Sequence, residues 1–113
     1  MNETQRERRG HAFLPDVATL AQIPDLYGTE DTDFSDKEIH LKFFCGAATW
    51  LIAELDPDSL LAFGHANLGD EQMAEWGYVS VVELEELAVS TPYGFTLVVE
   101  RDVHWTPKLY RDI

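Results

Sequence analysis

The sequence predicts an α+β fold, in which a single small domain has a curved antiparallel sheet of about four to five strands and two short helices. Three observations support this prediction. The chain has 113 residues, the size of one domain. Its apolar runs are short, several alternate with polar residues as half-buried strands do, and the links between them are too short for parallel crossovers. Two other segments have helical spacing, which favours helices on one side of the sheet.

The chain begins with a polar stretch, and we expect residues 1–14 to form a flexible tail that leaves 15–113 for the domain. The opening "MNETQRERRG" is not followed by the apolar region of a secretory signal. No apolar run approaches the roughly 18 residues that a membrane span requires. The single cysteine, Cys45, cannot form an internal disulfide. These features predict a cytoplasmic protein.

Helical patterns occur twice. In "DVATLAQI" the apolar residues share one helical face, Pro15 favours the first turn, and Pro24 ends the helix. An acidic loop, "PDLYGTEDTDFSDKE", follows. The second helix is predicted over 80–88, where Ser80 and Glu83 have the spacing of a capping box.

Strands are predicted for the runs 39–45, 48–56, 60–69, 76–79 and 95–105. The short glycine-containing link between the first two favours a hairpin. The turn sequence "DPDS" separates the second run from the third. We expect the last segment, "TPKLYRDI", to pack loosely.

Carboxylates at the ends of two predicted strands suggest one possible site. Strict alternation along 48–56 would place Glu54 and Asp56 on the same face as Trp50 and Ile52. The last strand would likewise align Glu100, Asp102 and His104. Such a cluster suits a hard divalent cation or acid–base chemistry, which makes a small metal- or ligand-binding module or enzyme the alternative hypothesis. The simpler interpretation is a solvated strand end beside a turn, and only Glu54 then lies inside its strand.

Other catalytic patterns are absent from the sequence. The four histidines and Cys45 lack the spacing of a zinc site, and no phosphate-binding glycine loop or serine elbow occurs. We therefore assign no catalytic residue, no metal ligand and no cofactor. A third interpretation is a small-ligand groove lined by Trp50, Trp76 or Trp105, although such residues are more often part of a core or an interface.

Several stretches of the chain together resemble a known family. They are "IPDLYGTED", "HLKFF", "ATWLIAELDPD", "FGHANLG", "EWGYVSVVELEEL" and "VERDVHWTP", in this order. Over about residues 20–108 the chain resembles the family DUF2958, but in "GDEQMAEWGYV" Trp76 replaces a leucine of the family pattern. The resemblance implies a small bacterial protein of plasmids, integrative elements and phages, often encoded near antirestriction genes. It implies no established activity and no catalytic residues.

Charge is the strongest compositional feature, with 21 acidic against 8 basic residues and a net charge of −13. Such a field repels nucleic acid and attracts basic surfaces. Together with the resemblance, it leads to the hypothesis of a non-enzymatic accessory protein of a mobile element. The expected partner is a basic, nucleic-acid-binding protein, for example a host nuclease or DNA-binding complex, without direct contact with nucleic acid or membrane.

The residues expected to bind this partner are acidic and fall into two groups. They are Glu30, Asp31, Asp33 and Asp36 in the loop, and Glu83, Glu85 and Glu86 on the second helix. Because an open sheet exposes edge strands that can pair, we expect a monomer or a homodimer.

Overall fold

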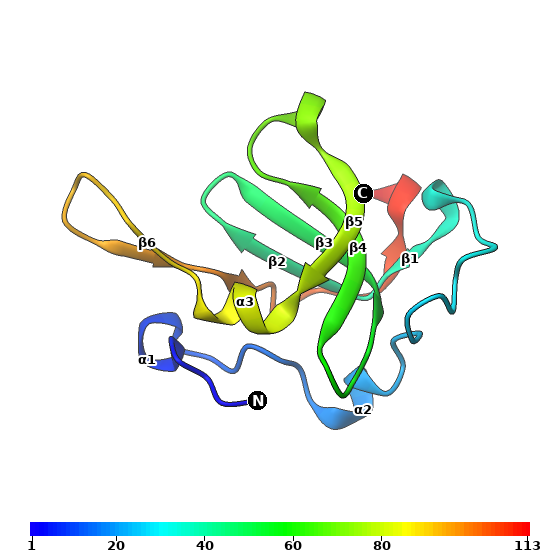
Figure 1. Ribbon diagram of the computed structural model, residues 1–113, viewed down its shortest axis with the longest axis horizontal. Helices are drawn as coiled ribbons and strands as arrows, with labels where there is room; N and C mark the ends of the chain where they lie inside the picture. The colour runs from blue at the N-terminus through cyan, green and yellow to red at the C-terminus, as the bar shows by residue number, and fades with distance from the viewer.

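The computed structural model describes all residues 1–113, and at its centre lies one antiparallel sheet of five strands (Figure 1). The strand order is β5-β4-β3-β2-β8. The strands are β2 (Leu41–Cys45), β3 (Ala48–Leu55), β4 (Leu61–Asn67), β5 (Glu75–Ser80) and β8 (Glu100–Arg101). The predicted α+β class with an antiparallel sheet and short helices is therefore confirmed.

The other elements are short. The helices are α1 (Arg6–Arg9), α2 (Val17–Leu20) and α3 (Val81–Glu86), and the 3₁₀ turns are η1 (Phe34–Asp36), η2 (Glu71–Met73) and η3 (Tyr110–Asp112). Two additional antiparallel pairs join β1 (Glu38–Ile39) to β9 (Lys108–Leu109) and β6 (Ala88–Ser90) to β7 (Thr96–Val98). None of the helices has the length and apolar character needed to cross a membrane.

Both predicted helices occur, and both are shorter than expected. α2 is one turn long, and the Asp16 side chain caps it by accepting a hydrogen bond from the Thr19 N–H at 2.8 Å. α3 begins as the capping box predicts, because the Ser80 hydroxyl accepts from the Glu83 N–H at 3.2 Å. It ends at Glu86, since the chain continues directly into β6.

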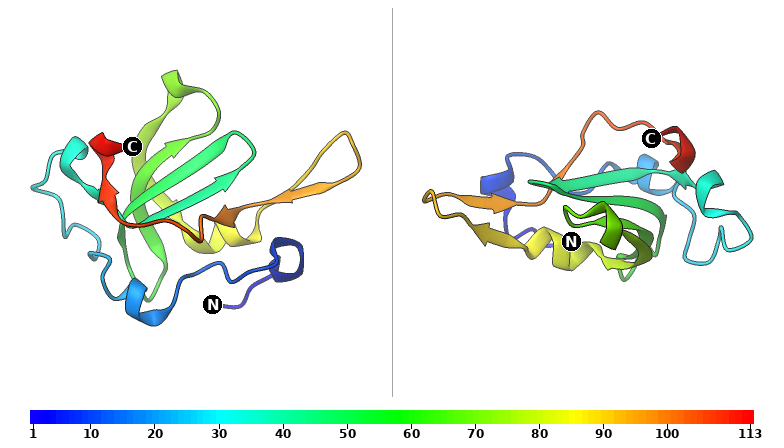
Figure 2. Two further views of the ribbon diagram at one scale, coloured as in Figure 1. Left: turned by 180° about the vertical axis from the view of Figure 1, so that it is seen from behind. Right: turned by 90° about the horizontal axis from the view of Figure 1, so that it is seen from above.

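The predicted hairpin of β2 and β3 is confirmed, but the predicted strand over 95–105 is not continuous. Its first part, β7, pairs with β6, whereas its second part, β8, pairs with β2 in the main sheet. The β6–β7 hairpin projects from the body of the protein (Figures 1 and 2). The sequence pattern could not show this division because β7 and β8 are separated by one residue only, Val99.

The sheet has an apolar core on each face. The larger core consists of twelve buried residues: Phe13, Ile23, Leu41, Phe43, Trp50, Ile52, Leu55, Leu60, Ala62, Val81, Leu84 and Val99. The smaller core, on the other face, contains Ile39, Leu51 and Ala53, with Trp76, Trp105 and Tyr110 packed against it. α3 lies on the side of the larger core, and η3 on the other side (Figure 2).

We expected residues 1–14 to lie outside the domain, but the structure packs this segment against it. The Phe13 ring is fully buried and stacks on Phe43, with ring centroids 4.5 Å apart. The buried Arg9 guanidinium donates to the Val99 carbonyl at 2.7 Å and to the Glu85 carboxylate at 2.9 Å. The partners of Arg9 and Phe13 are distant in sequence, so local patterning does not reveal these contacts.

The C-terminal segment, which we expected to pack loosely, is also attached to the domain. β9 pairs with β1, and the Tyr110 ring lies 5.0 Å from that of Trp76 and 5.1 Å from that of His65. The end of the chain therefore completes the smaller core.

A bulge in β3 sets the direction of Glu54. Ile52 pairs with Gly64, but the next paired residue, Glu54, lies opposite Phe63, so Ala53 is an extra residue in β3. The expectation that Glu54 shares a face with Trp50 and Ile52 is therefore wrong. The bulge reverses the alternation, so that Leu55 joins the larger core and Glu54 points to the face that carries Phe63.

The bulge requires glycine on the facing strand. A Cβ atom at Gly64 would lie 2.0 Å from the Leu51 carbonyl oxygen, which is far inside van der Waals contact. Gly77, which pairs with Gly64 on β5, has no heavy atom within 4 Å of the equivalent position.

Gly64→Ala is expected to lower the free energy of unfolding by about 3 kcal/mol, because the β3 backbone must move away from the new methyl group. Gly77→Ala is the matched control and is expected to change this free energy by less than about 1 kcal/mol. Urea denaturation of both variants measures the difference. Equal stabilities of the two variants would contradict the described bulge geometry.

Candidate functional site

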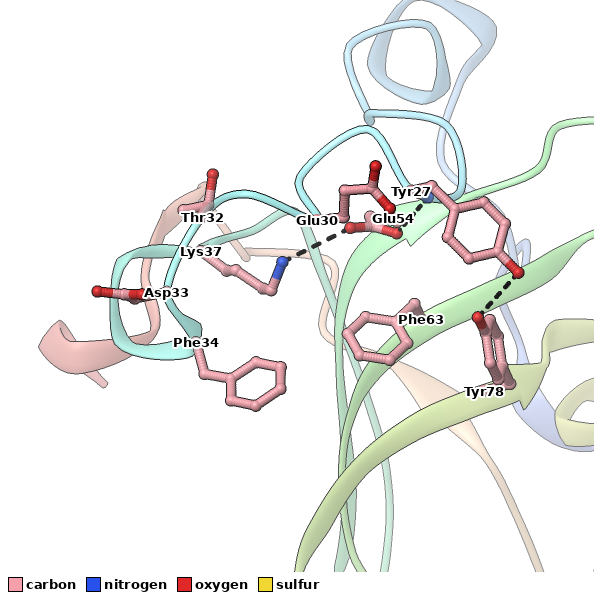
Figure 3. Close-up of a pocket in the computed structure, with 9 residues that line it drawn as sticks. All are labelled: Tyr27, Glu30, Thr32, Asp33, Phe34, Lys37, Glu54, Phe63 and Tyr78. Atoms are coloured by element: carbon pink, nitrogen blue, oxygen red, sulfur yellow. Dashed lines mark hydrogen bonds and ion pairs between the residues drawn. The ribbon is translucent and has the colours of Figure 1, made fainter.

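A pocket of about 370 Å³ opens between the acidic loop, defined here as residues 24–38, and the sheet (Figure 3). Aromatic rings form its floor and walls, and charged groups lie at its upper edge and on one side. The lining residues are Tyr27, Glu30, Thr32, Asp33, Phe34, Lys37, Glu54, Phe63 and Tyr78.

Glu54 fastens the acidic loop to the sheet. Its side chain is buried, and its carboxylate accepts hydrogen bonds from the Tyr27 N–H at 2.8 Å, the Thr29 N–H at 3.2 Å and the Thr29 hydroxyl. The Leu55 N–H adds a bond to the Pro24 carbonyl at 2.9 Å. Charge-assisted bonds of this kind are about twice as strong as neutral ones, so the turn at Tyr27 is held in a defined position.

Lys37 balances the charge of Glu54. The two side chains are both buried, with Lys37 Nζ 3.7 Å from Glu54 Oε2. Lys37 Nζ also donates to the carbonyl and to the hydroxyl of Thr29. An ammonium group and a carboxylate can be buried together because each has hydrogen-bonding partners as well as the opposite charge.

Aromatic side chains continue from the pocket across the outer face of the sheet. Phe34 stacks on Trp76 with a centroid distance of 4.9 Å, and Phe63 lies 5.9 Å from the same ring. At the other side the Tyr78 hydroxyl donates to the Tyr27 hydroxyl at 3.0 Å, which raises the pKa of Tyr78. The pocket therefore has rigid walls supported by ring stacking.

Three of these rings are exposed to solvent to an unusual extent for large side chains. The exposed fractions are 61% for Tyr27, 52% for Phe34 and 54% for Tyr78. Aromatic residues are enriched in the centres of protein interfaces, where they give large contact areas at low entropic cost. The open pocket is thus the part of this surface best suited to recognition.

Two of the four predicted acidic residues of the loop, Glu30 and Asp33, line this pocket. Glu30, Asp31 and Asp33 are exposed, and the Asp33 carboxylate is directed away from the pocket centre (Figure 3). Asp36 is half-buried and forms an ion pair with Arg111 at 2.9 Å. All four therefore lie on the loop surface, and Glu30 and Asp33 are the two that reach the pocket.

The three predicted residues of α3 do not belong to that surface. Glu83 and Glu86 are exposed, but α3 covers the opposite face of the sheet. Glu85 is only 1% exposed, so its assignment to a partner-binding surface is wrong. It serves the fold instead, since its carboxylate accepts from the Thr4 N–H at 2.7 Å, the Gln5 N–H at 3.0 Å and Arg9 at 2.9 Å.

The carboxylates of the alternative hypothesis do not converge on one site. Glu100 and Asp102 line a pocket together with His104, as expected, but Glu54 and Asp56 lie elsewhere. Asp56 caps its own turn by accepting from the Asp58 N–H at 2.9 Å, while Glu54 points into the pocket. Phe44 of β2 pairs with Glu100 on one side and with Thr49 of β3 on the other. Glu100 therefore lies near the start of β3, whereas Glu54 lies near its end. Asp102 accepts from the His104 N–H at 3.0 Å. No three His, Cys, Asp or Glu side chains are grouped so that they could hold a metal ion.

The tryptophans do not line a common groove. Trp50 lies in the larger core, whereas Trp76 and Trp105 pack against the smaller one. The Trp105 indole N–H donates to the Ile39 carbonyl at 2.9 Å. Burial raises the pKa of the Cys45 thiol, and the Glu100 carboxylate raises it further, so this cysteine is not an activated nucleophile.

Only part of the pocket carried a signal in the sequence. Glu54 stood out as the one carboxylate inside its strand, and the loop acids stood out by charge. Three other lining residues carried no signal in the sequence, because each is an ordinary residue of a loop or strand: Lys37, Phe63 and Tyr78. Their convergence depends on the pairing of β4 with β5 and on the packing of the loop against both.

Fold and site together define a small, mainly antiparallel domain with a preformed aromatic pocket beside an acidic loop. The model of the family described as "Protein of unknown function (DUF2958)" matches residues 20–110. The chain therefore belongs to this family, as the resemblance of its motifs predicted. No curated protein and no solved structure matches it.

The contacts of Glu85 predict a pH-dependent contribution to stability. Burial alone would raise its pKa, but hydrogen bonds from Thr4, Arg9 and Gln5 lower it below the ordinary value of 4.5. A lowered pKa in the folded state means that the stabilisation is complete above the ordinary pKa and is lost as pH falls through the folded-state pKa. Glu85→Gln is expected to cost about 3 kcal/mol at pH 7, since it leaves buried Arg9 without its closest counter-ion.

Urea denaturation at pH 7 and at a series of values below 4.5 measures this contribution for wild type and Glu85→Gln. The difference between the two proteins is expected to shrink as pH falls. Glu83→Gln, an exposed change on the same helix, is the matched control and is expected to cost little at any pH. A difference for Glu85→Gln that is independent of pH would contradict this account.

Proposed function

We propose that the protein is a binding module whose acidic loop and aromatic pocket dock onto a basic, nucleic-acid-binding protein. The observation that carries the proposal is the open pocket with three exposed aromatic rings beside the exposed carboxylates of Glu30, Asp31 and Asp33. Interfaces commonly combine an aromatic centre with a polar rim. The net charge of −13 would attract a basic surface and repel nucleic acid.

The rigidity of the acidic loop supports the proposal. Glu54 and Lys37 hold the turn at Thr29, Tyr27 is tied to Tyr78, and Phe34 is stacked on Trp76. A loop that is already ordered loses little conformational entropy when it binds, so more of the contact energy appears as affinity.

The buried and turn carboxylates already have hydrogen-bonding partners within the fold, which favours a binding function over a catalytic one. Glu54 is engaged with backbone N–H groups, Glu85 with Arg9 and the N-terminal segment, and Asp56 with its own turn. Each carboxylate thus has a role in the fold. The proposal accordingly treats the protein as non-enzymatic.

The family resemblance and the charge support a proposal for the biological setting. We propose a cytoplasmic accessory protein of a mobile element that acts on a host complex, for example a defence nuclease. The pocket uses residues of β3, β4 and the edge strand β5, whereas β8 at the other edge contributes none. The protein can therefore bind as a monomer or within a homodimer that pairs through β8.

Neutralising the loop tests this proposal. In the loop variant Glu30→Gln/Asp31→Asn/Asp33→Asn the net charge becomes −10, from −13 in the wild type. We expect the immobilised wild type to capture a basic nucleic-acid-binding protein from host lysate at low salt. The loop variant should capture about tenfold less of the same protein. Quantitative mass spectrometry of the captured proteins measures the difference.

The control variant Glu7→Gln/Asp58→Asn/Glu71→Gln removes the same charge from exposed positions outside the loop. It is expected to capture nearly as much as the wild type. High salt should weaken all captures, because it screens exposed charges. Equal losses in the two variants would show that only net charge matters, and capture of no nucleic-acid-binding protein by wild type would refute the proposal.

A further inference from the structure

We propose that the aromatic pocket receives one arginine side chain of the basic partner. This inference rests on the proposed function and names the group that the pocket would recognise. A volume of about 370 Å³ is near the lower end for small-molecule sites, and it suits one long side chain better than a folded segment.

The walls of the pocket match a flat cation. Phe63 forms the floor, with Phe34 on one side and Tyr27 and Tyr78 on the other (Figure 3). The centroid of Phe63 lies 6.4 Å from that of Phe34 and 5.5 Å from that of Tyr78. A guanidinium group is planar, weakly hydrated and able to stack on aromatic faces, so these rings can hold it without a large desolvation cost.

The protein already places one cation against these rings. Lys37 Nζ lies 5.9 Å from the Phe34 centroid and 5.8 Å from the Phe63 centroid. This ammonium group is bound to Thr29 and paired with Glu54, so it forms part of the wall and its charge is balanced. The side of the pocket formed by Tyr27 and Tyr78 carries no positive group.

Glu30 supplies the charge for the incoming group. It is exposed and lines the pocket, as Glu54 does, and none of the ion pairs within the protein involves its carboxylate. An arginine that stacks on Phe63 can donate to this carboxylate and to the tyrosine hydroxyls. With Glu54 balanced by Lys37, the pocket retains negative charge, and an anionic ligand would be repelled.

Titration with N-acetyl-arginine amide, followed by NMR shifts of the aromatic side chains, tests the inference without a partner. N-acetyl-citrulline amide has nearly the same shape and no charge. We expect arginine to bind about tenfold more tightly than citrulline, with the largest shifts at Phe63 and Tyr78. N-acetyl-lysine amide should bind more weakly than arginine, because a compact ammonium is more strongly hydrated.

Pocket variants locate the binding. Glu30→Gln and Tyr78→Leu are each expected to weaken arginine binding by about threefold to tenfold. The control Tyr93→Leu removes a tyrosine that is 85% exposed in the β6–β7 turn, and it should leave the affinity unchanged. Circular dichroism confirms that each variant is folded.

Equal binding of citrulline or lysine, or equal affinities of Tyr78→Leu and Tyr93→Leu, would overturn the inference. The proposed function fails separately, if the loop variant captures as much partner as wild type. The loop variant could lose partner capture while N-acetyl-arginine amide fails to bind the wild type. That result would support the docking surface and refute only the assignment of an arginine to the pocket.

Discussion

The arrangement of this protein's candidate site depends on one buried carboxylate. Glu54 points toward the pocket only because the extra residue Ala53 reverses the alternation of β3, and Gly64 makes room for the displaced backbone. Once turned to that face, Glu54 meets two backbone N–H groups of the acidic loop, and Lys37 supplies the opposite charge. A carboxylate without these partners would be costly to bury at this position.

The consequence is a loop that is polar yet ordered. Connecting loops are usually more mobile than the strands they join. In this loop, however, the Tyr27 N–H is bonded to Glu54 of the sheet and the Phe34 ring is stacked on Trp76. The same contacts keep Phe34 and Tyr78 apart, so that the pocket between them stays open. A second buried ion pair, between Arg9 and Glu85, lies on the other face of the sheet. It attaches the N-terminal segment to the larger core, as Glu54 attaches the acidic loop.

Local patterns were sufficient for the parts of the fold that depend on local chemistry. Alternation located β2 and β3, the glycine-containing link indicated their hairpin, and Ser80 marked the start of α3. Features that depend on a single inserted residue or on distant partners were not accessible. A period of two cannot reveal the extra Ala53. Helical spacing does place Glu85 on the face of Val81 and Leu84, apart from exposed Glu83 and Glu86. Its partners Thr4 and Arg9, however, are distant in sequence and carry no local signal. The acids of the loop were visible by charge, whereas the pocket beside them arises only from tertiary packing.

Amide hydrogen exchange at Tyr27 and Thr29 tests most directly whether Glu54 fastens the loop. In the wild type both N–H groups should exchange at least about tenfold more slowly than in an unstructured peptide, because each donates to the buried carboxylate. In Glu54→Gln an NH₂ group replaces one acceptor oxygen, so at least one of these two N–H groups should exchange faster. The His40 N–H, which donates to the Ile52 carbonyl, should stay protected. Exchange of the Tyr27 and Thr29 amides in the wild type at the rate of an unstructured peptide would contradict the account.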